Sequence, residues 1–196
     1  MSRGKARRKE KEDEQGCAFV DQGLEECEAL VTVDILRRSG AVVTMAAVGG
    51  EKRILGSHGI AFEADALAEE VNLEEYDMVF LPGGMPGTKN LEASPLVCEA
   101  AKRFAAGGKK VAAICAAPSV LGHLGLLQGK KAVCYPGFEK DLAGAEVLSA
   151  EAVTDGNITT GRGLGAAVPF ALKLVEALSG PDAARRLGEQ IIWMHE

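Results

Sequence analysis

The sequence lacks the features that mark several specialised classes of protein. It contains no run of the roughly 18–20 consecutive apolar residues that a transmembrane helix needs, which predicts a soluble protein without a membrane partner. It contains no C-x-x-C pair, and its 5 cysteines are an odd number, so a disulfide framework and a zinc-ribbon site are both disfavoured. We therefore expect reduced thiols in the cytoplasm and no bound metal.

Nucleotide and nucleic-acid ligands are disfavoured as well. The sequence has neither a G-x-G-x-x-G motif after a strand nor a G-K-[S/T] phosphate loop, and we expect no cofactor. Its 28 acidic residues outnumber its 22 basic ones, giving a net charge of −6. That balance argues against a nucleic-acid partner held by phosphate contacts.

What remains is a chain of globular composition with a charged beginning. A length of 196 residues with 47% hydrophobic residues is enough for one self-sufficient core. Residues 1–14 hold 6 basic and 4 acidic side chains and no large apolar residue beyond Met1, which predicts a disordered charged tail. A nucleic-acid-binding tail is the alternative, and the interleaved acids make it less favourable. We expect residues 15–196 to form a single domain.

Strand-like and helix-like segments alternate from Gly16 onward. Strands are expected at Cys17–Val20, Ala41–Val48, Met78–Leu81, Lys110–Ile114 and Ile158–Thr160, and helices at Glu25–Ser39, Ser94–Ala106, Pro118–Leu124, Gly165–Leu178 and Pro181–Trp193. Arg53–Leu55 and Ile60–Phe62 are expected to pair as a hairpin. The alternation predicts a doubly wound α/β fold, in which ligands bind at the carboxyl ends of the strands.

The most informative strand end carries Cys115. An apolar strand runs directly into this cysteine, and Pro118 then suits the first turn of a helix. Ala113, Ala116 and Ala117 give it minimal neighbours, as a tight strand–nucleophile–helix turn requires. The start of a helix favours the thiolate, which predicts an acidified, reactive thiol. The alternative is that Cys115 is a small buried hydrophobic residue.

Two glycine-rich segments follow other strands. Gly83 and Gly84 come directly after the strand ending at Leu81, where paired glycines let backbone N–H groups face an anion or an oxyanion. The second segment, Thr160–Gly165, also links a strand to a helix, although a tight turn alone would explain it.

The first helix supplies a candidate carboxyl group. Glu28 shares an apolar stripe with Val31 and Ile35, whereas Glu25 and Glu26 are expected beside it on other faces of the helix. A carboxyl group that faces the interior has a raised pKa, which suits a residue that holds or moves a proton beside a thiol. The alternative is that Glu28 reaches solvent at the edge of the sheet.

The remaining candidates are weaker. None of His58, His123 and His195 occupies a position that the sequence alone assigns to a general base. Cys134 follows a short apolar run and is a reserve candidate for a thiol facing the same crevice.

Together these motifs resemble the DJ-1/ThiJ/PfpI superfamily, and its DJ-1-like branch most closely. The resembling segments, in the same order as in that family, are Gly23–Glu28, Val33–Gly40, Leu81–Gly84, Ala113–Pro118 and Thr160–Gly163. The resemblance implies a flavodoxin-like three-layer sandwich of the class I glutamine amidotransferase-like type, with a mostly parallel sheet. It also implies a homodimer whose small-molecule partner is a carbonyl compound.

The same resemblance assigns roles to individual residues. Cys115 would be the nucleophile, and Glu28 the protonated carboxyl group that hydrogen-bonds its sulfur. Gly84 and Ala116 would offer backbone N–H groups to an oxyanion, with Gly83 beside them. 

Three further positions bear on the substrate site. His58 falls where some relatives have an arginine near the dimer interface and the active site. Tyr135 stands where many relatives have a histidine, and Leu164 replaces a proline common in the Arg-Gly-x-Gly loop. The general base is therefore not assigned by the resemblance.

The resulting hypothesis is a cofactor-independent glyoxalase or deglycase that converts small α-oxoaldehydes such as methylglyoxal to hydroxy acids such as lactate. A redox-sensing protein or chaperone acting through oxidation of Cys115 is the alternative. A glutamine amidotransferase would need a late His-x-Glu pair, and the adjacent His195 and Glu196 have the wrong spacing. A binding module without catalysis gives no reason for a cysteine at this turn.

Overall fold

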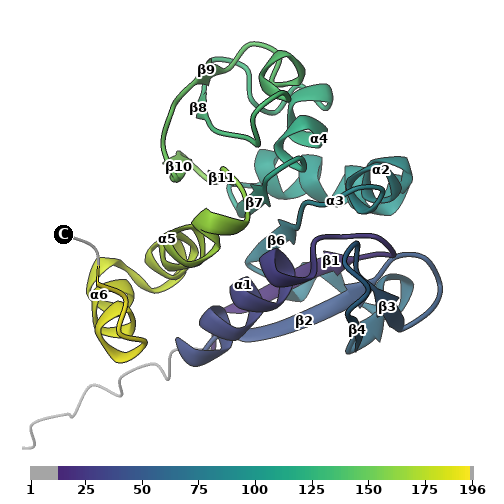
Figure 1. Cartoon of the computed structure of the whole chain (residues 1–196), viewed down its shortest axis with the longest axis horizontal. Helices are drawn as coiled ribbons and strands as arrows, with labels where there is room; N and C mark the ends of the chain where they lie inside the picture. The colour runs from purple at the N-terminus through teal and green to yellow at the C-terminus, as the bar shows by residue number, and fades with distance from the viewer. Residues whose placement is uncertain (1–12, 195–196) are drawn as a thin grey trace, which may run out of the picture.

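A 7-stranded sheet forms the centre of the computed structural model, which describes residues 13–194 (Figure 1). The strand order is β10-β11-β7-β6-β1-β2-β5, and β3 with β4 and β8 with β9 form two small separate pairs. The strands span Gln15–Val20 (β1), Val42–Ala47 (β2), Arg53–Leu55 (β3), Ala61–Glu63 (β4), Ala66–Leu67 (β5), Met78–Leu81 (β6), Lys110–Ile114 (β7), Lys131–Ala132 (β8), Glu146–Val147 (β9), Ala152–Asp155 (β10) and Ile158–Gly161 (β11).

The main sheet is parallel apart from β10, which pairs antiparallel with β11 at one edge. The central strands β6 and β11 are buried at every residue, as expected of parallel strands covered on both faces. Because β6, β7 and β11 are parallel, their carboxyl ends lie side by side. Leu81 pairs there with Ala113, and Gly161 pairs with Ile114.

Helices cover both faces of the sheet. The α-helices span Glu26–Arg38 (α1), Gly87–Ala93 (α2), Pro95–Ala106 (α3), Pro118–His123 (α4), Ala167–Ser179 (α5) and Pro181–Gln190 (α6). Short 3-10 helices span Ala68–Glu70 (η1), Leu73–Glu75 (η2), Glu139–Asp141 (η3) and Leu164–Ala166 (η4). Among residues 13–194, no helix combines the length and apolar character needed to cross a membrane.

Alternate residues of the central strands β1, β6 and β7 enter two separate cores. In β1, Ala18 and Val20 belong to the core under α1 and α5, whereas Cys17 and Phe19 belong to the core under α3 and α4. This division follows from the two-residue period of a strand. The helices α1 and α5 lie side by side on their face of the sheet, and α6 packs against α5 (Figure 1).

The predicted fold class is confirmed, and so are the predicted strands and helices to within a few residues at their ends. The β3–β4 hairpin is present, with β4 beginning at Ala61 instead of Ile60. The sequence did not predict α2, the short strand pair β8–β9, or the edge strands β5 and β10. The structure also differs at the start of α5, because its first predicted turn is the 3-10 helix η4.

The predicted charged tail lies mostly outside the described residues. Of its fourteen positions, 1–12 are not described. At the other end of the chain, the candidate His195 also lies outside the described residues. The two described residues, Asp13 and Glu14, precede β1, and the Glu14 carbonyl accepts a hydrogen bond of 2.9 Å from the backbone N–H of Val42. Backbone pairing between the first two strands therefore begins just before β1.

Candidate active site

Cys115 occupies the turn between β7 and α4 that the sequence predicts. Its φ is +65°, in the left-handed region that side-chain-bearing residues seldom adopt. Its backbone is held on both sides, since its N–H donates to the Gly161 carbonyl at 2.9 Å and its carbonyl accepts from the N–H of Tyr135 at 2.8 Å. Such a conformation costs about 1–3 kcal/mol and persists only where the surroundings enforce it.

The loop after β6 passes directly against this turn. A Cβ atom on Gly83 would lie 2.5 Å from the Cβ of Cys115 and 2.6 Å from Oε2 of Glu28. Ala116 and Ala117, which follow the cysteine, are both buried. Close packing against Cys115 therefore requires a glycine at position 83, and two small buried residues follow the cysteine, as the sequence predicts for a tight turn of this kind.

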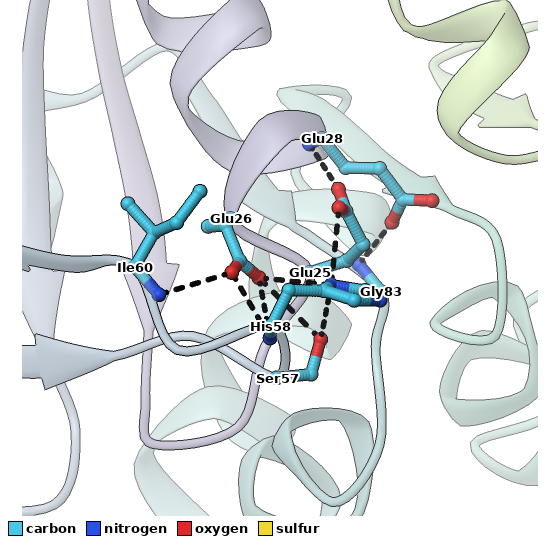
Figure 2. A network of polar contacts seen from close by, with 7 residues as sticks. All are labelled: Glu25, Glu26, Glu28, Ser57, His58, Ile60 and Gly83. Carbon is cyan, nitrogen blue, oxygen red and sulfur yellow. Dashed lines mark hydrogen bonds and ion pairs between the residues drawn. The ribbon is translucent and has the colours of Figure 1, made fainter.

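Glu28 lies in the interior, in the first turn of α1, with 1% of its surface exposed. Its backbone N–H donates to the carboxylate of the N-cap residue Glu25 at 2.5 Å, which fixes the start of the helix. Its own Oε2 accepts the backbone N–H of Gly83 at 3.1 Å, as Figure 2 shows. Glu28 also accepts a hydrogen bond from the backbone N–H of Leu164 and shares one with the side chain of Cys115. The structure thus brings together the two predicted catalytic side chains.

Burial governs the protonation of this pair. It raises the pKa of Glu28 to about 7, although the hydrogen bonds from Cys115, Gly83 and Leu164 act in the opposite direction. Burial, followed by the negative charge of Glu28, raises the pKa of Cys115 to about 12, against the lowering effect of the Gly84 and Ala116 N–H groups. The thiol is therefore not acidified by its position alone, in contrast to the sequence-based expectation. Of the two protons on this pair, the one on the carboxyl group is therefore lost first and the one on the thiol second.

Two backbone N–H groups point at the Cys115 sulfur, from Gly84 and Ala116. Gly84 has a φ of +87°, and a Cβ there would collide with the backbone nitrogen of Glu25, so only glycine fits. The N–H of Gly83 is taken by Glu28 instead. The two N–H groups that were expected to serve an oxyanion, those of Gly84 and Ala116, thus face the sulfur, whereas Gly83 beside them holds the carboxyl group.

His58 lies next to Glu25 and Glu26, in the loop between β3 and β4. Its side chain is largely exposed, and its Nδ1 is 3.3 Å from Glu26 Oε2 and 3.7 Å from Glu25 Oε1. Glu26 is 1% exposed and accepts the backbone N–H groups of His58 at 3.0 Å and Ile60 at 3.4 Å (Figure 2). Burial acts to raise the pKa of Glu26, but these backbone bonds and the His58 ring lower it overall.

The sequence did not predict this role for Glu26. Its burial depends on the hairpin loop closing over the start of α1, and Gly56 permits this, because a Cβ there would lie 2.5 Å from the Glu26 carboxyl carbon. Glu25, Glu26 and His58 have one ligand-type atom each within 4.8 Å of one another, a spacing that suits a metal ion. The carboxylate of Glu26 is already occupied by the loop's N–H groups, which favours a structural clamp.

Tyr135 and Leu164 are each about half exposed. They line a cavity of about 310 Å³ together with Pro136, Glu151, Arg162, Gly163, Gly165 and Ala166. The reserve candidate Cys134 is buried next to Tyr135, and burial is the main cause that raises its pKa to about 11. His123 lies elsewhere, between Glu92 at 2.6 Å and Asp141 at 3.7 Å.

Known proteins share this arrangement of elements. A family model described as the DJ-1/PfpI family matches residues 17–177. An oxidized DJ-1 of Toxoplasma gondii superposes with a TM-score of 0.88 at 36% identity, covering 92% of this chain and 99% of that one. DJ-1 homolog B of Arabidopsis thaliana is 40% identical over 167 residues, which are 84% of this chain and only 38% of that protein.

A further relative carries a name that describes an activity. A protein of Pyrococcus abyssi named as a deglycase is 38% identical over 111 residues, 56% of this chain and 66% of that protein. The family match covers the strand ends and the helix that carry Cys115, Glu28 and Gly84. By sequence and by fold, this chain belongs to the DJ-1/PfpI family.

Proposed function

We propose that the protein is a cofactor-independent enzyme that converts small α-oxoaldehydes such as methylglyoxal to 2-hydroxy acids such as lactate. The observation that carries this proposal is the hydrogen-bonded pair of Cys115 and Glu28, with the N–H groups of Gly84 and Ala116 directed at the sulfur. A nucleophile, a carboxyl group of pKa about 7 and two oxyanion donors thus meet at one point.

The first step is addition of sulfur to the aldehyde carbon. Above about pH 7 the Glu28 carboxylate accepts the thiol proton of Cys115 as the C–S bond forms. The carbonyl electron pair moves to oxygen, where the N–H groups of Gly84 and Ala116 stabilise the negative charge. Glu28 then returns the proton to that oxygen, and the product is a neutral hemithioacetal.

The second step is an internal redox change that needs no external oxidant. Glu28 takes the proton from the former aldehyde carbon and delivers it to the neighbouring ketone carbon, while the hydroxyl proton passes to the ketone oxygen. The first carbon is oxidised to a thioester and the second is reduced to an alcohol. Water then attacks the thioester, the C–S bond breaks, the sulfur recovers its proton, and the hydroxy acid leaves.

The test is the loss of methylglyoxal and the formation of lactate, followed with purified protein. We expect Cys115→Ser to lower the rate by more than about 1000-fold, because no other thiol faces both donors. Glu28→Ala is expected to act similarly, and Cys98→Ser, on α3 away from the site, is the control. Full activity in the Cys115 variant would disprove the proposal.

A redox role for the same cysteine is the second candidate. The N–H groups that face the sulfur would also hold the oxygens of a sulfinate, and the Toxoplasma relative is described as oxidized. Mass analysis after mild peroxide treatment tests this role. Oxidation at Cys115 ahead of the other four thiols, in a protein without aldehyde turnover, would favour the redox role over the enzyme.

We further propose that the protein is a cytoplasmic homodimer. All five cysteines are free thiols, which suits a reducing compartment. An apolar groove beside α1, lined by Leu30, Val31, Ile35 and others, offers a surface for a second copy. Light scattering of the wild type and of Val31→Glu tests the dimer, which the added charge is expected to dissociate.

A further inference from the structure

The cavity beside Cys115 has mainly apolar walls. Its volume is about 310 Å³, its large apolar side chains are those of Tyr135, Pro136 and Leu164, and the charged residue Glu151 also lines it. Arg162 also lines it, but its guanidinium Nη1 donates to Ser149 Oγ at 3.1 Å. A cavity of this kind recognises a ligand through its apolar part.

Cys115 does not itself line the cavity, and Gly163, which does, lies next to its sulfur. A Cβ placed on Gly163 would lie 3.2 Å from the ring of Tyr135 and 3.9 Å from Sγ of Cys115. Gly163 thus stands between the tyrosine ring and the sulfur without filling the space with a side chain. A substrate bound covalently to the sulfur has its substituent within reach of that ring.

The backbone fixes both apolar walls relative to the reactive pair. The N–H of Tyr135 donates to the carbonyl of Cys115 at 2.8 Å. The N–H of Leu164 donates to the carboxyl group of Glu28. The two side chains that line the cavity therefore belong to residues anchored on the nucleophile and on its proton partner, so a substituent meets them in a defined position.

Both side chains leave apolar surface exposed that a substrate can cover. Tyr135 is 51% exposed and Leu164 is 50% exposed. The methyl group of methylglyoxal is too small to cover a tyrosine ring and a leucine side chain together. A phenyl or branched alkyl group would remove more of this surface from water and would gain the corresponding hydrophobic free energy.

We propose that Tyr135 and Leu164 make the enzyme selective for α-oxoaldehydes with a large apolar substituent, such as phenylglyoxal, over methylglyoxal. The proposal rests on the proposed function, because the substituent is placed by the bond between the aldehyde and Cys115. The selectivity comes from side chains of this sequence and not from the reacting groups, which are the same for both aldehydes.

The experiment compares kcat/KM for phenylglyoxal and methylglyoxal in the wild type, Tyr135→Ser and Leu164→Ser. Leu55→Ser is the matched control, because Leu55 is 51% exposed on β3 and does not line the cavity. The two aldehydes differ in intrinsic reactivity, and this difference cancels when the phenylglyoxal-to-methylglyoxal ratio is compared between proteins. We expect the ratio to fall by about tenfold in each cavity variant and to stay constant in the control.

A second measurement separates failure of this proposal from failure of the proposed function. The rate of Cys115 alkylation by N-phenyliodoacetamide relative to iodoacetamide reports the same apolar contact without any turnover. We expect this ratio to fall by about tenfold in the two cavity variants as well. If the wild type turns over neither aldehyde, the proposed function fails, and the alkylation ratio still decides whether the cavity selects apolar groups. Ratios that are the same in wild type, Tyr135→Ser and Leu164→Ser would overturn the selectivity.

Discussion

The carboxyl group of Glu28, in the first turn of α1, is hydrogen-bonded to the side chain of Cys115 at the end of β7. Backbone N–H groups hold both partners, Gly83 and Leu164 on the carboxyl group and Gly84 and Ala116 on the sulfur. The site is therefore assembled from four segments that meet at the carboxyl ends of the strands: the start of α1, the loop after β6, the turn after β7 and the start of η4. Its chemistry depends on the proton that the two side chains share.

Gly83→Ala tests the close packing between the β6 loop and Cys115. The added Cβ would lie 2.5 Å from the Cβ of Cys115, and the two loop segments have to separate to accommodate it. We expect the free energy of unfolding to fall by about 1–3 kcal/mol, measured by chemical denaturation. Gly165→Ala is the control, since its Cβ would meet nothing within 4 Å. Equal stability of the two variants would show that the predicted contact is absent.

Glu28→Gln tests the raised pKa of the buried carboxyl group. The pKa of Glu28 is about 7 in the folded protein, against an ordinary value of 4.5, so folding favours the protonated form. The resulting stability is fully present below about pH 4.5 and is lost as the pH rises through about 7. This shift corresponds to about 3 kcal/mol at about pH 8. The variant is expected to lack this loss, so unfolding curves collected at a series of pH values should be flatter than those of the wild type. Parallel pH profiles would contradict a raised pKa.

Glu26→Gln tests the clamp on the hairpin loop. The Glu26 carboxylate accepts the N–H groups of His58 and Ile60, and the neutral amide makes weaker bonds to them. We expect hydrogen exchange at these two amides to quicken by about tenfold. Glu63→Gln, on the exposed side of the same hairpin, is the control. Unchanged exchange in Glu26→Gln would mean that other contacts hold the loop.

Much of the fold could be predicted from local patterns. The strands β6 and β7 occupy the predicted residues, because continuous apolar runs mark strands buried on both faces. The edge strands β5 and β10 were not predicted, because they are short and partly exposed and have no such run. The 7-residue helix α2 begins at a glycine and carries few apolar residues, so it shows no periodic pattern either.

Cys115 and Glu28 could be chosen as candidates from the sequence, but their surroundings could not be predicted. Cys115 is marked by the strand before it and the small residues around it, and Glu28 by its place on an apolar stripe. The burial of Glu26 and the contact between the Leu164 N–H and Glu28 depend on loops far away in the sequence. The raised pKa of Cys115 also comes from burial and from Glu28, which a local pattern does not measure.

The pH dependence of Cys115 alkylation, in the wild type and in Glu28→Gln, tests the coupled pair most directly. If Glu28 takes the thiol proton, the wild-type rate rises through an inflection near pH 7, where the carboxyl group ionises. Glu28→Gln cannot accept a proton, so the inflection near pH 7 should be absent. Its alkylation rate should instead rise in a single step as the thiol ionises, with a thiol pKa below that of the wild type because the negative charge of Glu28 is gone. Identical pH profiles for the two proteins, rising only toward pH 12, would contradict the account.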